Sequence, residues 1–134
     1  MNVRMGLLRK KQDWTDERFC DYWRNTHGPL AARVPNLREY WQNVVTDRLQ
    51  RGIDFARGPW DFDGISQLWF DDVKHAEHAF RDSGIAATLI EDEALLFDRL
   101  HIVTVRQDVV IPVPEDAARA QLLKRISTLK RKPD

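Results

Sequence analysis

The sequence predicts one α+β domain built on a mostly antiparallel sheet, and three observations lead to this expectation. The chain has 134 residues, which is enough for one domain with one core. Hydrophobic residues make up 43% and charged residues 31% of it, the profile of a globular protein. Apolar residues recur with strand and helix periods in the order β-α-β-β-α-α-β. Separated helices over a mostly antiparallel sheet are typical of the ferredoxin-like α+β pattern.

The first two elements are a strand over residues 3–10 and a helix that begins at Thr15. One side of the strand carries three apolar residues, Val3, Met5 and Leu7. Thr15 is typical of a helix N-cap, and two acidic residues follow it where the helix dipole favours negative charge. The apolar stripe of this helix is expected to contain Phe19, Trp23, Thr26 and Leu30. Gly28-Pro29 is expected to kink or interrupt the helix.

The same signals predict the remaining elements. Strands are expected over residues 37–46, 64–70 and 99–107, and helices over residues 72–83 and 86–97. Gly84 separates the two helices. The second of them is expected to have an apolar stripe of Leu89, Ile90, Ala94 and Phe97. The connection over residues 47–63 is long, and such loops within a compact domain are often functional or mobile.

The pattern divides the chain into a domain and an extension. Residues 1–108 are expected to form the ferredoxin-like domain. Residues 109–134 are expected to form a C-terminal extension, with a short edge strand over 109–114 and a helix over 115–130.

Apolar residues occur on both faces of the predicted sheet, which bears on assembly. Helices on one side of a sheet bury only one face, and the other face is normally polar. Here the second face needs a cover, either the sheet of a second chain or the C-terminal extension folding back. We favour a homodimer packed sheet to sheet, because closed two-fold pairs are the commonest oligomers.

Charge and cysteine content bear on the partners and the compartment of the protein, and the only local excess of basic residues is in the C-terminal tail. Twenty-one basic residues balance twenty-one acidic ones, so no overall attraction to nucleic acid or to an acidic membrane is expected. Cys20 is the only cysteine, which excludes an intrachain disulfide and fits a reducing compartment.

No segment approaches the ~20 apolar residues that span a bilayer, and the first residues lack the apolar core of a signal peptide. A cytoplasmic protein is expected.

The segment over residues 19–30 is the most informative one for function. It places His27 at the end of an aromatic-rich helix, immediately before the Gly-Pro break. A neutral imidazole that reaches into a cleft between helix and sheet can accept a proton from a carbon acid or deliver one to a leaving group. Alternatively, His27 ends the helix and bonds a backbone carbonyl. Position alone leaves both interpretations open.

Cofactor and metal sites find little support in the sequence. No glycine-rich dinucleotide fingerprint follows a strand, and no phosphate-binding Gly-Lys-Ser/Thr is present. His75 and His78 have a spacing that can bind a metal, but their segment is typical of an exposed helix face. Cys20 is expected to be a small residue at the edge of the core. We therefore expect neither a cofactor nor a metal.

Four groups of residues occur in an order that is typical of one family. They are Phe19…Tyr22-Trp23-Arg24…His27-Gly28-Pro29-Leu30, Pro35-x-Leu37…Tyr40-x-Gln42-Asn43, Asp63-Gly64-Ile65…Leu68-Trp69-Phe70-Asp71 and Glu91-Asp92-Glu93…Phe97-Asp98. From about residue 3 to residue 107 the chain resembles the EthD family, named for a protein linked to ethyl tert-butyl ether degradation. Residues 112–134 lie outside the resemblance.

The resemblance implies a ferredoxin-like fold that pairs into a dimeric α+β barrel. Relatives of this fold include lactone isomerases, polyketide cyclases, pigment-pathway dehydratases and cofactor-free monooxygenases, and others have no assigned reaction. The histidine that matches His27 lies in the cleft of relatives that isomerise muconolactones, which implies a proton shuttle at this position. A shared fold alone does not assign the reaction.

Two main functional hypotheses follow, and a third makes the basic C-terminal tail an element that docks a partner. In the first, the protein is a cofactor-independent lyase, isomerase or cyclase that acts on a small hydrophobic carbonyl compound in a catabolic or biosynthetic pathway. His27 is then the acid/base, Trp23, Tyr40 and Trp69 form the pocket walls, and Asn43 donates a hydrogen bond to a developing enolate oxygen. In the second, the protein is a non-catalytic accessory protein that carries a small hydrophobic molecule of such a pathway. Tyr40 and Asn43 lie on opposite faces of their strand, and the sequence does not indicate which face meets the helices.

Overall fold

The computed structural model describes residues 2–47, 61–82, 84–112, 119–120 and 123–124. Most of the predicted connection over residues 47–63 and most of the predicted helix over residues 115–130 lie outside these ranges. Residues 109–112 form no strand, which differs from the short edge strand expected over 109–114. A strand requires a hydrogen-bonding neighbour as well as β-branched residues, and composition alone does not supply one.

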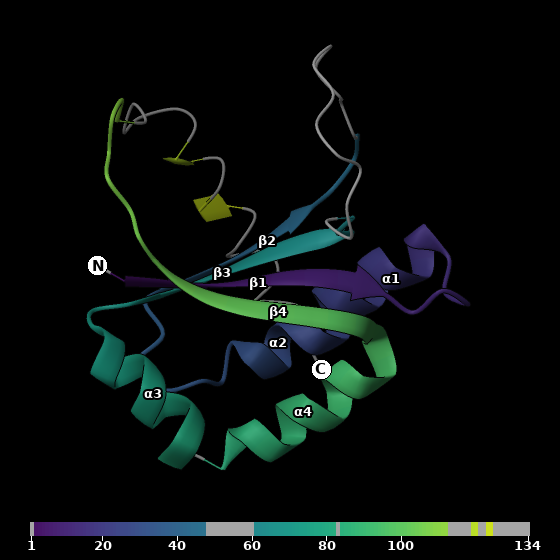
Figure 1. Ribbon diagram of the computed structural model, residues 1–134, viewed down its shortest axis with the longest axis horizontal. Coiled ribbons are helices and arrows are strands. Elements are labelled where there is room, and N and C mark those ends of the chain that lie inside the picture. The colour runs from purple at the N-terminus through teal and green to yellow at the C-terminus, as the bar shows by residue number, and fades with distance from the viewer. Residues whose placement is uncertain (1, 48–60, 83, 113–118, 121–122, 125–134) are drawn as a thin grey trace.

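The fold is a four-stranded antiparallel sheet with helices on one face, as Figure 1 shows. The strands are β1 (Asn2–Lys10), β2 (Glu39–Val44), β3 (Gly64–Phe70) and β4 (Phe97–Arg106), in the sheet order β2-β3-β1-β4. The helices are α1 (Asp16–Tyr22), η1 (Trp23–His27), α2 (Gly28–Ala31), α3 (Val73–Asp82) and α4 (Ile85–Leu96). The predicted α+β class with a ferredoxin-like sheet is confirmed.

The register of β1 decides which side chains meet the helices. Arg4, Gly6 and Leu8 point to the face that the helices cover, which we call the inner face. Val3 and Met5 point to the opposite, outer face, beside Trp69 and Gln67 of β3. On β4 the same alternation places Ile102 on the inner face and Val103 on the outer face.

The first helix begins as predicted and widens before its end. The Thr15 side chain accepts a hydrogen bond from the amide of Arg18, which confirms the N-cap. The segment η1 is a π-helical turn, in which the amide of Gly28 donates to the carbonyl of Trp23 five residues earlier. Pro29 has no amide hydrogen for the regular α-helical bond, and its ring clashes with the carbonyl four residues before it. The Gly-Pro pair thus widens the helix instead of ending it.

The π-turn changes which residues of this helix are buried. A regular α-helix turns about 400° in four residues, so side chains at every fourth position drift by about 40° per step. The wider turn offsets this drift and keeps one row of side chains directed inward. The buried row is Phe19, Trp23, His27 and Ala31. The expected stripe is therefore corrected at Thr26, which is exposed.

The core consists of two clusters of buried side chains. One joins β1, α1, η1 and the end of α4, and its buried members are Leu8, Trp14, Phe19, Trp23, Leu96 and Phe97. The other joins β3, α2, α3 and the start of α4. Trp23 is 1% exposed, and its ring lies so close to Gly64 that a Cβ at residue 64 would fall 2.7 Å from the ring. A residue with no side chain is thus required where the indole crosses the sheet.

We predict that Gly64→Ala lowers the free energy of unfolding by about 1–3 kcal/mol, because the added methyl group overpacks the Trp23 ring. Chemical denaturation measures this change. Replacing Trp23 by Phe removes the ring atoms that the methyl group meets, so the double variant should lose less stability than the sum of the two single variants. Strictly additive losses would contradict this explanation.

Candidate functional site

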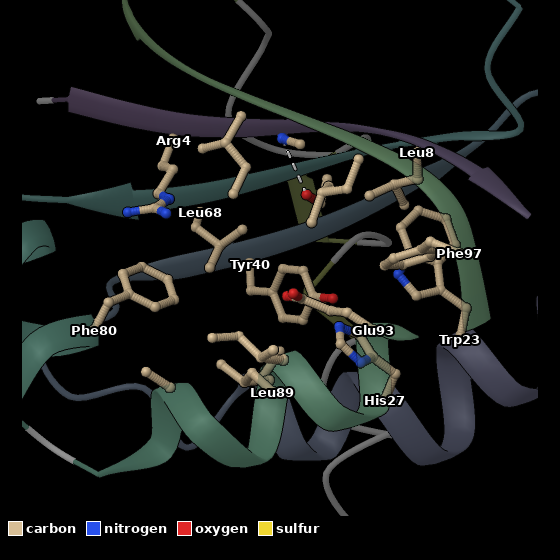
Figure 2. Close-up of a pocket in the computed structure, with 17 residues that line it drawn as sticks. Arg4, Leu8, Trp23, His27, Tyr40, Leu68, Phe80, Leu89, Glu93 and Phe97 are labelled. Carbon is tan, nitrogen blue, oxygen red and sulfur yellow. Dashed lines mark hydrogen bonds between the residues drawn. The ribbon is translucent and has the colours of Figure 1, made fainter. Parts of the chain in front are cut away.

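A cavity of about 300 Å³ lies between the inner face of the sheet and the helices. Its walls come from both core clusters, with Trp23 and Phe97 on one side and Leu68 and Leu89 on the other. Figure 2 shows these side chains converging on a common space below the strands. The volume is that of a small-molecule pocket, and most of its lining is apolar.

His27 contributes an imidazole to this cavity from the end of η1. The residue is 5% exposed, and its Nδ1 lies 2.7 Å from Oδ2 of Asp92 on α4. An ionised carboxylate only accepts hydrogen bonds, so Nδ1 carries the proton of the pair. The other ring nitrogen, Nε2, has no hydrogen-bond partner among the residues that the structure describes. It is the atom available to a ligand.

Asp92 also binds a second donor, the phenol of Tyr22 at the end of α1. The Tyr22 hydroxyl donates to Oδ1 of Asp92 while His27 occupies Oδ2. The hydrogen bond to Asp92 raises the pKa of Tyr22 to about 12, so this phenol keeps its proton. Both carboxylate oxygens are thereby satisfied, and the carboxylate has one fixed orientation relative to the imidazole.

Burial and Asp92 have opposing effects on the pKa of His27. Burial lowers the pKa of His27 from its ordinary value, and the hydrogen bond to Asp92 offsets part of this change. The net direction is downward, which favours the neutral imidazole near neutral pH. With Nδ1 protonated toward Asp92, the neutral ring exposes the lone pair of Nε2 and is able to accept a proton.

Tyr40 adds a phenol to the same cavity from β2. Its oxygen accepts a hydrogen bond from Nε2 of Gln42 at 2.9 Å, and the same amide donates to the carbonyl of Trp23 at 2.7 Å. Burial raises the pKa of Tyr40, which keeps its hydroxyl protonated. Gln42 thus leaves the Tyr40 proton available for donation to a ligand oxygen, and it ties β2 to the π-turn.

Two charged side chains complete the lining. The guanidinium of Arg4 lies 4.2 Å from the ring centre of Phe80, and burial lowers its pKa. Burial also raises the pKa of Glu93, an effect that the charge of Arg4 opposes. Within the described chain no ion pair joins these two groups, although both line the cavity.

Comparison with known proteins places the chain in a family. Residues 11–100 match the family described as the EthD domain. The chain belongs to the EthD family. No curated protein was found to match the sequence.

Solved structures with the same fold share little sequence with this EthD-family chain. An EthD-family protein from Bacillus halodurans has 18% identity and a TM-score of 0.60, covering 81% of this chain and 100% of that chain. A dimeric ferredoxin-like protein of unknown function from Thermobifida fusca has 16% identity and a TM-score of 0.54, covering 80% and 92%. A hydroxynitrile lyase from Passiflora edulis has 13% identity and a TM-score of 0.56, covering 83% and 96%. At these identities the likeness establishes the shared fold.

Three of the five site residues predicted from the sequence meet at the cavity of this EthD domain. They are Trp23, His27 and Tyr40. Asn43 and Trp69 are corrected, because both point to the outer face of the sheet. Asn43 donates to the carbonyl of Ile65 at 2.8 Å, and the buried indole nitrogen of Trp69 has no acceptor among the described residues. Since the helices cover the face of Tyr40, strand alternation places Asn43 on the far side.

The structure adds four polar residues that the sequence analysis did not single out as site residues. They are Arg4, Tyr22, Asp92 and Glu93. The expected stripe of α4 is corrected as well, because Ile90 and Ala94 are exposed. Leu89 and Phe97 are buried as expected, and Ile85 and Leu96 take the places of the other two. The spacing of Ile85, Leu89 and Leu96 brings Asp92 to the same face. The sequence signal that could have identified Asp92 and Glu93 as site residues is their place, as acidic residues, on an otherwise apolar helix.

The cavity opens between α4 and β4. Ile90 on α4 and Ile102 on β4 both line it, yet they are 64% and 48% exposed. A residue that lines a cavity and is also exposed to solvent lies at the opening of that cavity. Ile90 and Ile102 are both apolar, so the opening is apolar on these two sides. A ligand that passes them must shed water before it reaches the polar groups inside.

Metal and membrane sites are not evident in the ranges described. These residues contain no group of three or more His, Cys, Asp or Glu side chains placed to hold a metal ion. The same ranges hold no helix with the length and apolar character that crossing a membrane requires. His75 lies on the exposed surface of α3, where it contacts Asp72.

We predict that acidification destabilises the protein through His27. Because the pKa of His27 is lowered on folding, the unfolded chain binds the proton first as the pH falls below about 6.5. Stability is therefore fully present above that pH and declines as the pH approaches the folded-state pKa. NMR titration of the imidazole measures the pKa directly, and denaturation at several pH values measures the stability. His27→Gln should flatten the decline, and a folded-state pKa above 6.5 would contradict the prediction.

Proposed function

We propose that this protein is a cofactor-independent lyase, isomerase or cyclase that acts on a small, largely apolar carbonyl compound. The observation that supports it best is the His27–Asp92 pair, whose Nδ1–Oδ2 distance is 2.7 Å, at the wall of an apolar cavity. A histidine that only ended a helix would need no oriented carboxylate behind it. The pair is the arrangement by which a neutral imidazole is held ready to accept a proton.

The proposed chemistry is proton transfer at carbon. Nε2 of His27 takes a proton from the carbon next to the substrate carbonyl, and the electron pair of that C–H bond moves to give an enolate. The phenol of Tyr40 donates a hydrogen bond to the enolate oxygen, the role first expected of Asn43. Return of the proton from His27 to another carbon isomerises the substrate. In a lyase step, the enolate electrons re-form the carbonyl and a C=C bond while the substituent on the next carbon leaves with the electron pair of its bond, and His27 gives its proton to that leaving group. Neither path requires an oxidant or a reductant.

One structural neighbour supports the choice of reaction class. The fold is shared with a hydroxynitrile lyase, with a TM-score of 0.56. That protein shares only 13% identity with this chain, so it supports a lyase as one of several options and indicates no particular substrate.

The proposal extends to the setting in which the protein works. Cys20 is the only cysteine and the net charge is zero, which suits a reducing cytoplasm and gives no general attraction to nucleic acid or membranes. A small hydrophobic carbonyl compound of this kind belongs to a catabolic or a biosynthetic pathway.

A homodimer packed through the outer face of the sheet is part of the proposal. Met5 is partly exposed on this face, and Val103 is 43% exposed. Arg119 of the C-terminal extension reaches this face at Glu39 of β2, with an Nη2–Oε1 distance of 3.1 Å. The β1–β4 half lies at the other side of the sheet order, where Val3 is already buried and Met5 and Val103 offer apolar surface for a second copy. A neighbour described as dimeric and ferredoxin-like supports this assembly.

We predict that Val103→Glu shifts the protein from dimer to monomer, because the new charge would be buried in the pair of sheets. Analytical ultracentrifugation at several concentrations measures the equilibrium. Leu95→Glu is the matched control, since Leu95 is 61% exposed on the helical side. A wild-type protein that is monomeric at all concentrations would refute the assembly.

We predict that His27→Gln slows proton exchange at carbon by about 100-fold or more. The protein is incubated in D2O with cyclohexanone or γ-butyrolactone, and NMR follows the loss of the α-proton signals. Asp92→Asn should also reduce the rate and alter its pH profile, since Asp92 holds the proton on Nδ1 of His27 and raises the pKa of the imidazole. The exposed His75→Gln serves as the control and should leave the rate unchanged.

The outcomes separate the two functional hypotheses. Equal exchange rates in the wild type and in His27→Gln would exclude the proposed acid/base. Binding of these compounds by the wild type without any exchange would instead favour the non-catalytic accessory protein.

A further inference from the structure

We propose that Arg4 anchors a carboxylate of the ligand, so that the cavity takes an apolar compound with an anionic group at the end remote from His27. The identity of the other end as a carbonyl rests on the proposed function, whereas the anion subsite stands on Arg4 and its surroundings. Arg4 lies on the inner face of β1, between Leu68 of β3 and Thr104 of β4, and its side chain lines the cavity.

Phe80 fixes the guanidinium through one flat face and does not cover the edge where its donors lie. The cation lies over the aromatic ring, with its Cζ 4.2 Å from the ring centre. This contact occupies one flat face of the guanidinium. The five N–H donors of an arginine lie at the edge of that plane, in a fork that matches the two oxygens of a carboxylate. The stacked arginine is therefore oriented for a bidentate partner.

No carboxylate among the described residues pairs closely with Arg4. Four other arginines of the described chain form ion pairs with carboxylates, namely Arg9, Arg38, Arg106 and Arg119. Arg4 has no carboxylate oxygen within 4.0 Å among the described residues, and Glu93 acts on it from a longer distance. A guanidinium stays charged in proteins, and a charge removed from water gains from an ion-paired partner. A ligand carboxylate supplies that partner.

Glu93 sets the direction in which such a ligand binds. Figure 2 shows Arg4 and Phe80 toward one end of the cavity, Tyr40 and Glu93 near its middle, and His27 farther from Arg4. Glu93 and Asp92 disfavour a second anion at the His27 end. The anionic group is thus directed to Arg4 and the neutral reacting group to His27, with Leu68 and Leu89 in contact with the apolar part between them.

The experiment uses phenylacetate and phenylacetamide, which have nearly the same shape and differ in charge. Isothermal titration calorimetry with the full-length protein should show that phenylacetate binds on the order of tenfold more tightly. In the wild type, NMR signals of the Arg4 Nε–H should shift on adding phenylacetate and not on adding phenylacetamide. Equal affinities, or an Arg4 signal that does not respond, would overturn the inference.

Variants separate this subsite from the proposed catalytic role. Arg4→Met keeps much of the side-chain length and should abolish the preference for phenylacetate, and Arg4→Lys should keep part of it because the charge remains. Arg38→Met is the surface control and should bind both compounds like the wild type. An unchanged preference in Arg4→Met would refute the subsite.

His27→Gln provides the distinguishing test, because it should leave the preference for phenylacetate intact. If the preference depends on Arg4 while α-proton exchange does not depend on His27, the subsite stands and the proposed function fails. The reverse result leaves the function standing and removes the subsite. The wild-type comparison needs no variant, so it decides the question even if Arg4→Met does not fold.

Discussion

The carboxylate of Asp92 is the interaction on which the arrangement of the site depends. It accepts hydrogen bonds from Tyr22, the last residue of α1, and from His27, the last residue of η1. Hydrogen bonds to a charged group contribute about 1.5–3 kcal/mol each when they are well made. A carboxylate in this position without its two donors would be desolvated and uncompensated. One residue of α4 thus holds the first helix in place and fixes the tautomer and tilt of the imidazole.

The π-turn is the second constraint, and it acts together with Asp92. It brings His27 onto the same buried row as Trp23, and the amide of Gln42 binds the Trp23 carbonyl that the wider turn uses. Gly64 completes the arrangement by leaving room for the indole against β3. The sheet, the turn and α4 therefore each limit where the imidazole lies. Several independent contacts of this kind hold an irregular turn in a single conformation.

The parts of this structure that sequence reasoning predicted are those encoded by local periodicity. Alternation located β3, and Gly84 with its positive φ marks the end of α3 as expected. The π-turn was not predictable in this way, because it combines a local effect of Pro29 on the carbonyl of Asn25 with a hydrogen bond from the distant Gln42 to the carbonyl of Trp23. The alternation of β2 showed that Tyr40 and Asn43 are on opposite faces, but only tertiary packing decides which face meets the helices.

Trp23, His27 and Tyr40 were predicted from their own segments, whereas the partner Asp92 was missed because it comes from a distant part of the chain. His27 and Trp23 belong to one short, unusual segment of sequence, so their proximity was evident. Asp92 lies 65 residues from His27 in the chain, and no local pattern connects them. Acidic residues near the end of a helix are usually solvated, so Asp92 and Glu93 resembled surface positions until the burial of Leu89 and Leu96 placed them.

The apolar opening between α4 and β4 determines how a molecule gains access to the interior. The helix α4 runs directly into β4, and away from this junction the side chains of Ile90 and Ile102 line the gap between them. Rotation of Ile90 and Ile102 about their own bonds is fast, on the picosecond to nanosecond scale for exposed side chains. A ligand can therefore enter without unfolding of α4 or β4. The opening selects compounds by their width and by the free energy that their dehydration costs.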